Sequence, residues 1–248
     1  MREKIRVVIE RLGLLIPARW TNRLVRFPWV QKLLFALVDK EEAELLFQKA
    51  WARRFKEHPE VLGDYWRAYR DLDKILKFVD GGSRILDVGC GISTVLGLLP
   101  GRRVGVDPLA ERYKSIYSYP EGIEIIAAPG ERLPFPDASF DAVFCTNALD
   151  HMLSPAQALG EMRRVLVEGG RLVLTIEIFE VARERDPAHP HALSSGAVRD
   201  LVEGSGFSIE STTVSPWIGI SRYLEGLRSS DEKETILISR KVPVTTAP

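Results

Sequence analysis

The most constraining feature of this chain is a pair of glycines set between two short apolar runs that carry an aspartate at their ends. Residues 85–109 read ILDVGCGISTVLGLLPGRRVGVDPL, with Asp87 and Asp107 closing the runs and Gly89 and Gly91 following the first. Glycine lets the backbone turn sharply and approach a ligand closely. Because ligands of open parallel sheets bind beyond the carboxyl ends of strands, this segment predicts a strand, a ligand-binding turn and a second strand.

Short apolar runs alternate with helical segments over the rest of the chain, which predicts an α/β fold. We expect helices on both faces of a mostly parallel, seven-stranded, Rossmann-like sheet, with an antiparallel strand inserted at one edge. The expected strands are 84–88, 103–107, 123–127, 140–145, 171–177, 207–214 and 235–240. The expected helices lie near 92–99, 108–116, 154–167 and 195–204.

The N-terminal region differs from the rest because apolar residues repeat at helical spacing throughout residues 1–80. We expect a helical extension over 1–70, a ligand-binding domain over 71–241 and a disordered tail over 242–248. The aromatic residues Tyr65, Trp66 and Tyr69 either pack against the sheet or fold over the ligand.

The chemistry of the two aspartates selects the class of ligand. An acid that closes the second strand suits a ribose, whose hydroxyls donate to a carboxylate. A dinucleotide site needs a third glycine to bring a helix N-terminus to the pyrophosphate, and Thr94 occupies that position. The negative charge of Asp87 repels a pyrophosphate but attracts an amino group. The segment therefore favours a zwitterionic nucleoside such as S-adenosylmethionine.

Four stretches in order give the chain a family resemblance over about residues 70–215. LDVGCG (86–91) resembles the first motif of the class I S-adenosylmethionine-dependent methyltransferases, and VGVDP (104–108) their second. GERLPFPDASFDAVFCTNALDHM (130–152) resembles their segment into the fourth strand, and MRRVLVEGGRLVLTIE (162–177) the helix, glycine turn and fifth strand. The likeness is to the branch with ubiquinone/menaquinone and small-molecule enzymes, which implies S-adenosylmethionine as the methyl donor.

The resemblance also implies which residues bind the donor. The glycine turn would line the methionine moiety, the second aspartate would accept from the ribose, and an asparagine after the fourth strand would lie near the methyl group. The implied donor-binding residues are Asp87, Gly89, Gly91, Asp107, Pro108, Gly130, Glu131 and Asn147. The chain departs from the pattern at Ser93, where a third glycine is common, and at Pro129, where an acid often meets adenine. Backbone near 130–131 would then hold the adenine.

Methyl transfer from a sulfonium needs alignment more than acid–base chemistry, and a base only where the acceptor arrives protonated. The candidate catalytic residues are His151 and Asp150, in NALDHM. An imidazole titrates near neutrality and suits a hydroxyl acceptor; the alternative is that His151 packs the following turn. Glu177, His189 and His191 are further candidates for the acceptor pocket. We expect no metal site.

Charge and cysteine content exclude other classes. Lys+Arg and Asp+Glu both number 34, and the core has no basic stripe, so we expect a small-molecule, lipid or glycan-type acceptor and no nucleic acid. Cys90 and Cys145 lie in apolar runs, which is typical of packing in a reducing cytoplasm. The competing hypothesis is a non-catalytic module that binds S-adenosylmethionine on the same fold.

Residues 1–38 carry a concentrated positive charge, with eight Lys/Arg and two acids. Residues 1–36 either form a cap on the sheet or lie in a membrane interface, with cations near anionic headgroups. Deletion of residues 1–36 distinguishes the two hypotheses. If the segment is an anchor, the shortened protein no longer sediments with anionic vesicles, but its core stays folded and binds the donor. If it is a cap, the shortened protein melts at a lower temperature and loses acceptor binding. We expect a cytoplasmic protein. The alternative is a cytoplasmic protein that contacts the membrane surface through residues 1–36.

Overall fold

One seven-stranded sheet organises the molecule. The computed structural model describes residues 40–69, 72–178, 190–216 and 233–243. The strands lie in the order β3-β2-β1-β4-β5-β7-β6, and β7 runs in the opposite direction to the other six described strands. Their bounds are β1 Arg84–Val88, β2 Arg102–Val106, β3 Ile123–Ile126, β4 Phe140–Thr146, β5 Leu166–Ile178, β6 Phe207–Pro216 and β7 Lys233–Lys241. The predicted fold class is confirmed, and the strand order reverses between β1 and β4.

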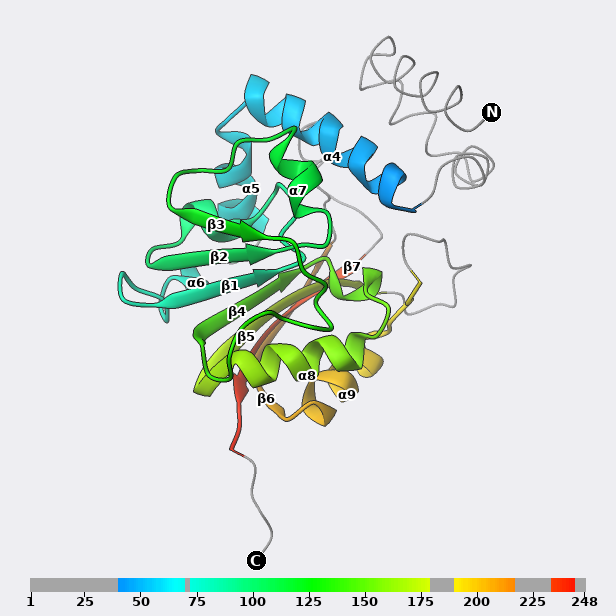
Figure 1. Cartoon of the computed structure of the whole chain (residues 1–248). Coiled ribbons are helices and arrows are strands. Elements are labelled where there is room, and N and C mark those ends of the chain that lie inside the picture. The colour runs from blue at the N-terminus through cyan, green and yellow to red at the C-terminus, as the bar shows by residue number, and fades with distance from the viewer. Residues whose placement is uncertain (1–39, 70–71, 179–189, 217–232, 244–248) are drawn as a thin grey trace, which may run out of the picture.

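Helices cover both faces of this sheet. Figure 1 shows α4, α5 and α7 on one side and α8 and α9 on the other. The helices are α4 Lys40–Glu57, α5 Val61–Tyr69, α6 Leu72–Ile75, α7 Ala110–Lys114, α8 Pro155–Val165 and α9 Ser195–Gly204, with 3₁₀ turns η1 Val95–Leu98 and η2 Leu149–His151. Serines begin the two long helices of the second face. The Ser154 and Ser194 hydroxyls accept from backbone N–H groups at positions 157 and 197.

The strands bury side chains on both faces, which explains their continuous apolar runs. Leu86 and Val88 of β1 belong to the core beneath α8 and α9. Ile85 belongs to the opposite core, where Tyr65 and Trp66 of α5 pack with it. The packing interpretation of these two aromatic residues is therefore confirmed. Both cysteines are also buried in apolar surroundings, as expected.

The expected helix at 92–99 is the clearest local error. Only Val95–Leu98 form a 3₁₀ turn, because Thr94 is extended and its hydroxyl caps the N–H of Leu96. Gly97 and Pro100 then oppose any longer helix. Strand β5 begins five residues before its expected start.

The N-terminal hypotheses fall largely outside the described residues, which begin at 40. The described part of the extension packs closely on the sheet domain. Leu45 and Phe55 of α4 share an apolar cluster with Ile92, Leu109 and Tyr113. Across the described ranges, no helix combines the length and the apolar character needed to span a membrane.

Candidate functional site

The glycine turn after β1 lies at the carboxyl edge of the sheet, beside the reversal of strand order. Gly89 and Gly91 both have positive φ angles, 72° and 49°, which favour glycine. Gly89 also lies against the segment after β4, since a Cβ there would come within 2.4 Å of the Ala148 Cβ. A side chain at position 89 would force the turn and the end of β4 apart.

Asp87 is a fully buried carboxyl group at this turn. The Thr94 hydroxyl donates to its Oδ2 at 2.6 Å, whereas Oδ1 has no hydrogen-bond partner among the described residues. Burial raises the pKa of Asp87 from 3.8 to about 7, against the lowering effect of the Thr94 bond. A buried oxygen without a donor costs about 1–3 kcal/mol, so Oδ1 is well suited to an amino group brought by a ligand.

Asp107 follows β2 and is almost fully buried. Its Oδ1 accepts the Leu109 N–H at 2.9 Å and its Oδ2 accepts the Gly91 N–H at 3.2 Å. Burial raises the pKa of Asp107 to about 6, and these backbone bonds oppose the rise. Each carboxylate oxygen can accept a second hydrogen bond, so the group fits the two hydroxyls of a ribose. Pro108, the next residue, is exposed.

The two raised acids predict an unusual pH dependence of stability. Between pH 4 and 7 the unfolded Asp87 is ionised while the folded one keeps its proton, so the unfolded state binds fewer protons. Stability of the ligand-free protein therefore falls as pH rises through this window, by up to about 1.4 kcal/mol per pH unit for one such group. We expect the melting temperature to fall between pH 5.5 and 7.5, and Asp87→Asn to flatten that fall. An identical slope in the variant would contradict the assignment to Asp87.

Polar groups after β4 form the second part of the site. Asn147 adopts a positive φ of 50° while its N–H donates to Thr175 O at 2.8 Å, and its buried Oδ1 has no partner in the described chain. Asp150 is 1% exposed, and neither of its carboxyl oxygens has a hydrogen-bond partner there. The Nε2 atom of His151 lies 3.9 Å from Asp150 Oδ2. The predicted pair of catalytic residues is thus adjacent in space as well as in sequence.

Of the further predicted residues, His191 lies near this pair. The Nε2 atom of His191, which precedes α9, is 2.9 Å from the carbonyl oxygen of Met152. Glu177 is buried at the end of β5 and lies across from Glu234 of β7. His189 lies outside the described residues. Among the described residues, no cluster of three or more His, Cys, Asp or Glu side chains could hold a metal ion.

The predicted adenine segment contacts the same loops. A Cβ at Gly130 would come within 2.9 Å of the Met152 sulfur. The Glu131 carboxylate accepts the N–H groups of Leu153 and Ser154 at 2.7 and 3.2 Å, just before α8. The side chain of Glu131 therefore fixes the segment after β4, and its backbone carbonyl oxygen accepts from Gln157 Nε2 at 3.2 Å. The contact of the 130–131 backbone with adenine stays a prediction.

Sequence reasoning missed the contribution of α4 to this site. The Gln48 side chain is buried, and its Oε1 lies 3.4 Å from the Ile92 N–H, directly after the glycine turn. Tyr119 also reaches the turn, because its hydroxyl donates to Gly91 O at 2.8 Å. The signal at Gln48 was a lone polar residue on the apolar side of a helix, which sequence spacing alone does not connect to the turn.

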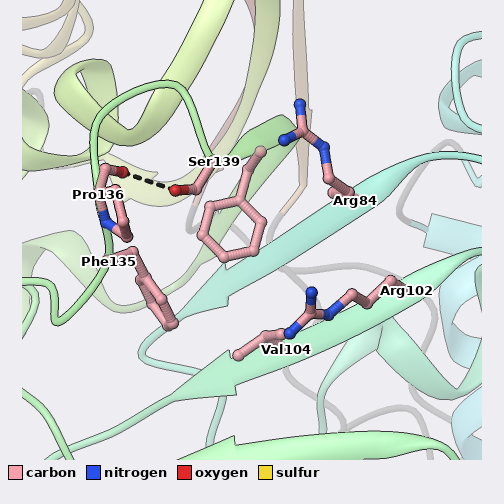
Figure 2. A pocket seen from close by; sticks show the side chains of 7 residues that line it. Arg84, Arg102, Val104, Phe135, Pro136 and Ser139 are labelled. Carbon is pink, nitrogen blue, oxygen red and sulfur yellow. Dashed lines mark hydrogen bonds between the residues drawn. The ribbon is translucent and has the colours of Figure 1, made fainter.

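A separate hollow of about 160 Å³ lies at the opposite, amino edge of the sheet (Figure 2). Arg84, Arg102 and Phe140, which begin β1, β2 and β4, help to line it, together with Phe135. Arg84 is held there by Asp141 at 2.9 Å. Because this hollow opens at the amino ends of the strands, it is distinct from the candidate donor site.

Comparison with known proteins shows what part of this arrangement is similar to. Residues 86–174, which contain the glycine turn, both aspartates and the loop after β4, match the family described as Methyltransferase domain. A putative methyltransferase of Bacillus halodurans has the same fold, with a TM-score of 0.55 at 20% identity over 70% of this chain and 100% of that chain.

Curated relatives match over similar stretches. The ubiquinone/menaquinone biosynthesis C-methyltransferase of Hahella chejuensis is 33% identical over 121 residues, 48% of this chain and 45% of that protein. An O-methyltransferase of Penicillium expansum is 28% identical over 176 residues, 64% of this chain and 63% of that protein. The chain thus spans less than two thirds of the length of either relative, and the two act on different kinds of atom.

Proposed function

We propose that the protein is a class I S-adenosylmethionine-dependent methyltransferase that methylates a small-molecule acceptor whose reactive atom carries a proton. The match of residues 86–174 to the family described as Methyltransferase domain supports this proposal. The residues present fit the donor. Asp87 Oδ1 and Asn147 Oδ1 are buried acceptors without partners in the described chain, as an amino group requires. Asp107 offers a carboxylate to ribose hydroxyls. S-adenosylmethionine, when bound, supplies an activated methyl group.

The observation that carries the proposal is the buried carboxyl group of Asp150 beside His151. His151 would take the proton from the oxygen or nitrogen of the acceptor as that atom is methylated, and the bound donor would supply the methyl group and be left as a neutral thioether. The imidazolium that results lies 3.9 Å from Asp150 Oδ2, whose negative charge stabilises it. His151 would thus act as the base, and Asp150 would orient and stabilise it.

Donor binding and methyl transfer test this proposal in sequence. We expect calorimetry to show binding of S-adenosylmethionine, and isotope-labelled donor to transfer its methyl group to members of a panel of alcohols, phenols and amines. Absence of binding would contradict the donor site. Binding without transfer to any acceptor would favour the non-catalytic module.

A further inference from the structure

Helix α4 is fixed on the glycine turn by contacts at several points along its length. Its apolar residues pack against Ile92 and Tyr113. Arg112 of α7 forms ion pairs with Glu42 and, at 3.9 Å, with Glu41 at the start of α4. Figure 1 shows α4 and α7 side by side above the sheet. These contacts give the polar residues of α4 a defined position at the donor site.

Gln48 is the residue of α4 that reaches the turn. Its side-chain nitrogen lies 3.3 Å from the position of a Cβ on Gly91, so it fills the space beside that glycine. Its oxygen is 3.4 Å from the Ile92 N–H, while the neighbouring Gly91 N–H donates to Asp107 at 3.2 Å. Two consecutive backbone N–H groups are therefore flanked by the carboxylate of Asp107 and the amide of Gln48.

Glu44 sets the orientation of this amide. Gln48 Nε2 donates to Glu44 Oε1 at 2.7 Å, and an ionised carboxylate only accepts hydrogen bonds. The amino group of Gln48 must therefore face Glu44, and its oxygen must face Ile92. Glu44 also lies close enough to Asp107 for its charge to raise the pKa of that acid. The amide of Gln48 therefore lies between Glu44 and the glycine turn, and Asp107 lies close to both.

The amide supplies a capacity that Asp107 lacks. A ribose presents hydroxyl groups that both donate and accept hydrogen bonds, whereas a carboxylate can satisfy only the donors. The amino group of Gln48 has a second N–H besides the one that Glu44 accepts. We propose that Gln48 is a further ribose-binding residue of the donor site and that Glu44 positions its amide. This inference rests on the donor site of the proposed function.

The test compares ribose-containing and deoxyribose-containing ligands. Calorimetry would measure the Kd of S-adenosylhomocysteine and of its 2′-deoxy and 3′-deoxy analogues for the full chain and for Gln48→Ala. We expect the substitution to raise the Kd of S-adenosylhomocysteine about 5- to 10-fold and to raise the Kd of at least one deoxy analogue much less. Arg53→Ala is the matched control, because Arg53 lies on the same helix, is exposed and pairs with Glu57. It should change none of these constants.

Each contrary result has a clear meaning. Equal weakening of all three ligands would assign Gln48 a purely structural role and overturn the inference, as would an unchanged or lower Kd for S-adenosylhomocysteine. If Gln48→Ala fails to fold, Gln48→Asn carries the same comparison, since it keeps an amide that is one methylene shorter. A wild-type protein that does not bind S-adenosylhomocysteine would instead overturn the donor site itself.

Discussion

Replacing His151 by alanine should lower the turnover number by about 10²–10⁴-fold and leave the Kd for S-adenosylmethionine nearly unchanged. The variant removes the group that takes the acceptor's proton, whereas the donor-binding side chains keep their places. Steady-state kinetics with an acceptor found by the labelling experiment, together with calorimetry, would measure both quantities. The loss should be greatest near neutral pH, where an imidazole is unprotonated while the acceptor still holds its proton, and smaller at high pH, where the acceptor ionises without a base.

Two further variants make this result specific. Asp150→Asn keeps the size of the buried side chain but removes its charge, so we expect a smaller loss of turnover than in His151→Ala. His191→Ala removes the neighbouring imidazole that contacts Met152 O. Turnover that survives the change at 151 but falls with the change at 191 would transfer the role of base to His191. Near-normal turnover in both histidine variants would return them to packing roles.

Asp107→Ala should raise the Kd for S-adenosylmethionine by about 10- to 150-fold, which corresponds to roughly 1.5–3 kcal/mol for hydrogen bonds to a charged acceptor. The substitution removes the carboxylate that the ribose hydroxyls would meet. It also removes the bonds that Asp107 accepts from Leu109 and Gly91. Calorimetry and thermal melting should therefore be carried out on the same samples.

A matched change at the same position separates the two effects. Asp107→Asn keeps an oxygen for the Leu109 N–H but places its NH2 group at the Gly91 N–H and has no negative charge, so it should disturb the turn less than alanine does and still weaken donor binding. A folded Asp107→Ala protein with unchanged affinity would contradict the ribose assignment. Loss of stability in both variants with unchanged affinity would make Asp107 a purely structural acid.

The parts of the site that the sequence predicted are those encoded within a few residues. The strand, the two positive-φ glycines and Asp87 are consecutive, and the turn after Asp107 closes on Leu109 only two residues later. The apolar runs likewise predicted the sheet, because most of the described strands bury apolar side chains. Local signals of this kind do not depend on how distant elements pack.

The parts that sequence reasoning missed depend on contacts between distant elements. Gln48 meets Ile92 across 44 residues, and that contact depends on how α4 rotates about its axis when its apolar side packs. Thr94 was recognised only as a departure from a glycine pattern, although its hydroxyl binds Asp87 and its conformation ends the expected helix. Both are polar residues whose partners follow from tertiary packing and not from spacing.

The position of β7 also has a consequence for the order of folding. It is the last of the described strands, yet it lies inside the sheet, with β5 on one side and β6 on the other. Until residues 233–241 leave the ribosome, the edge of β5 from Arg171 to Ile178 lacks its partner, and β6 has no strand through which to join the sheet. Unpaired edges of this length are prone to pair with other chains. We therefore expect a nascent chain of this protein to be prone to aggregation until β7 is made.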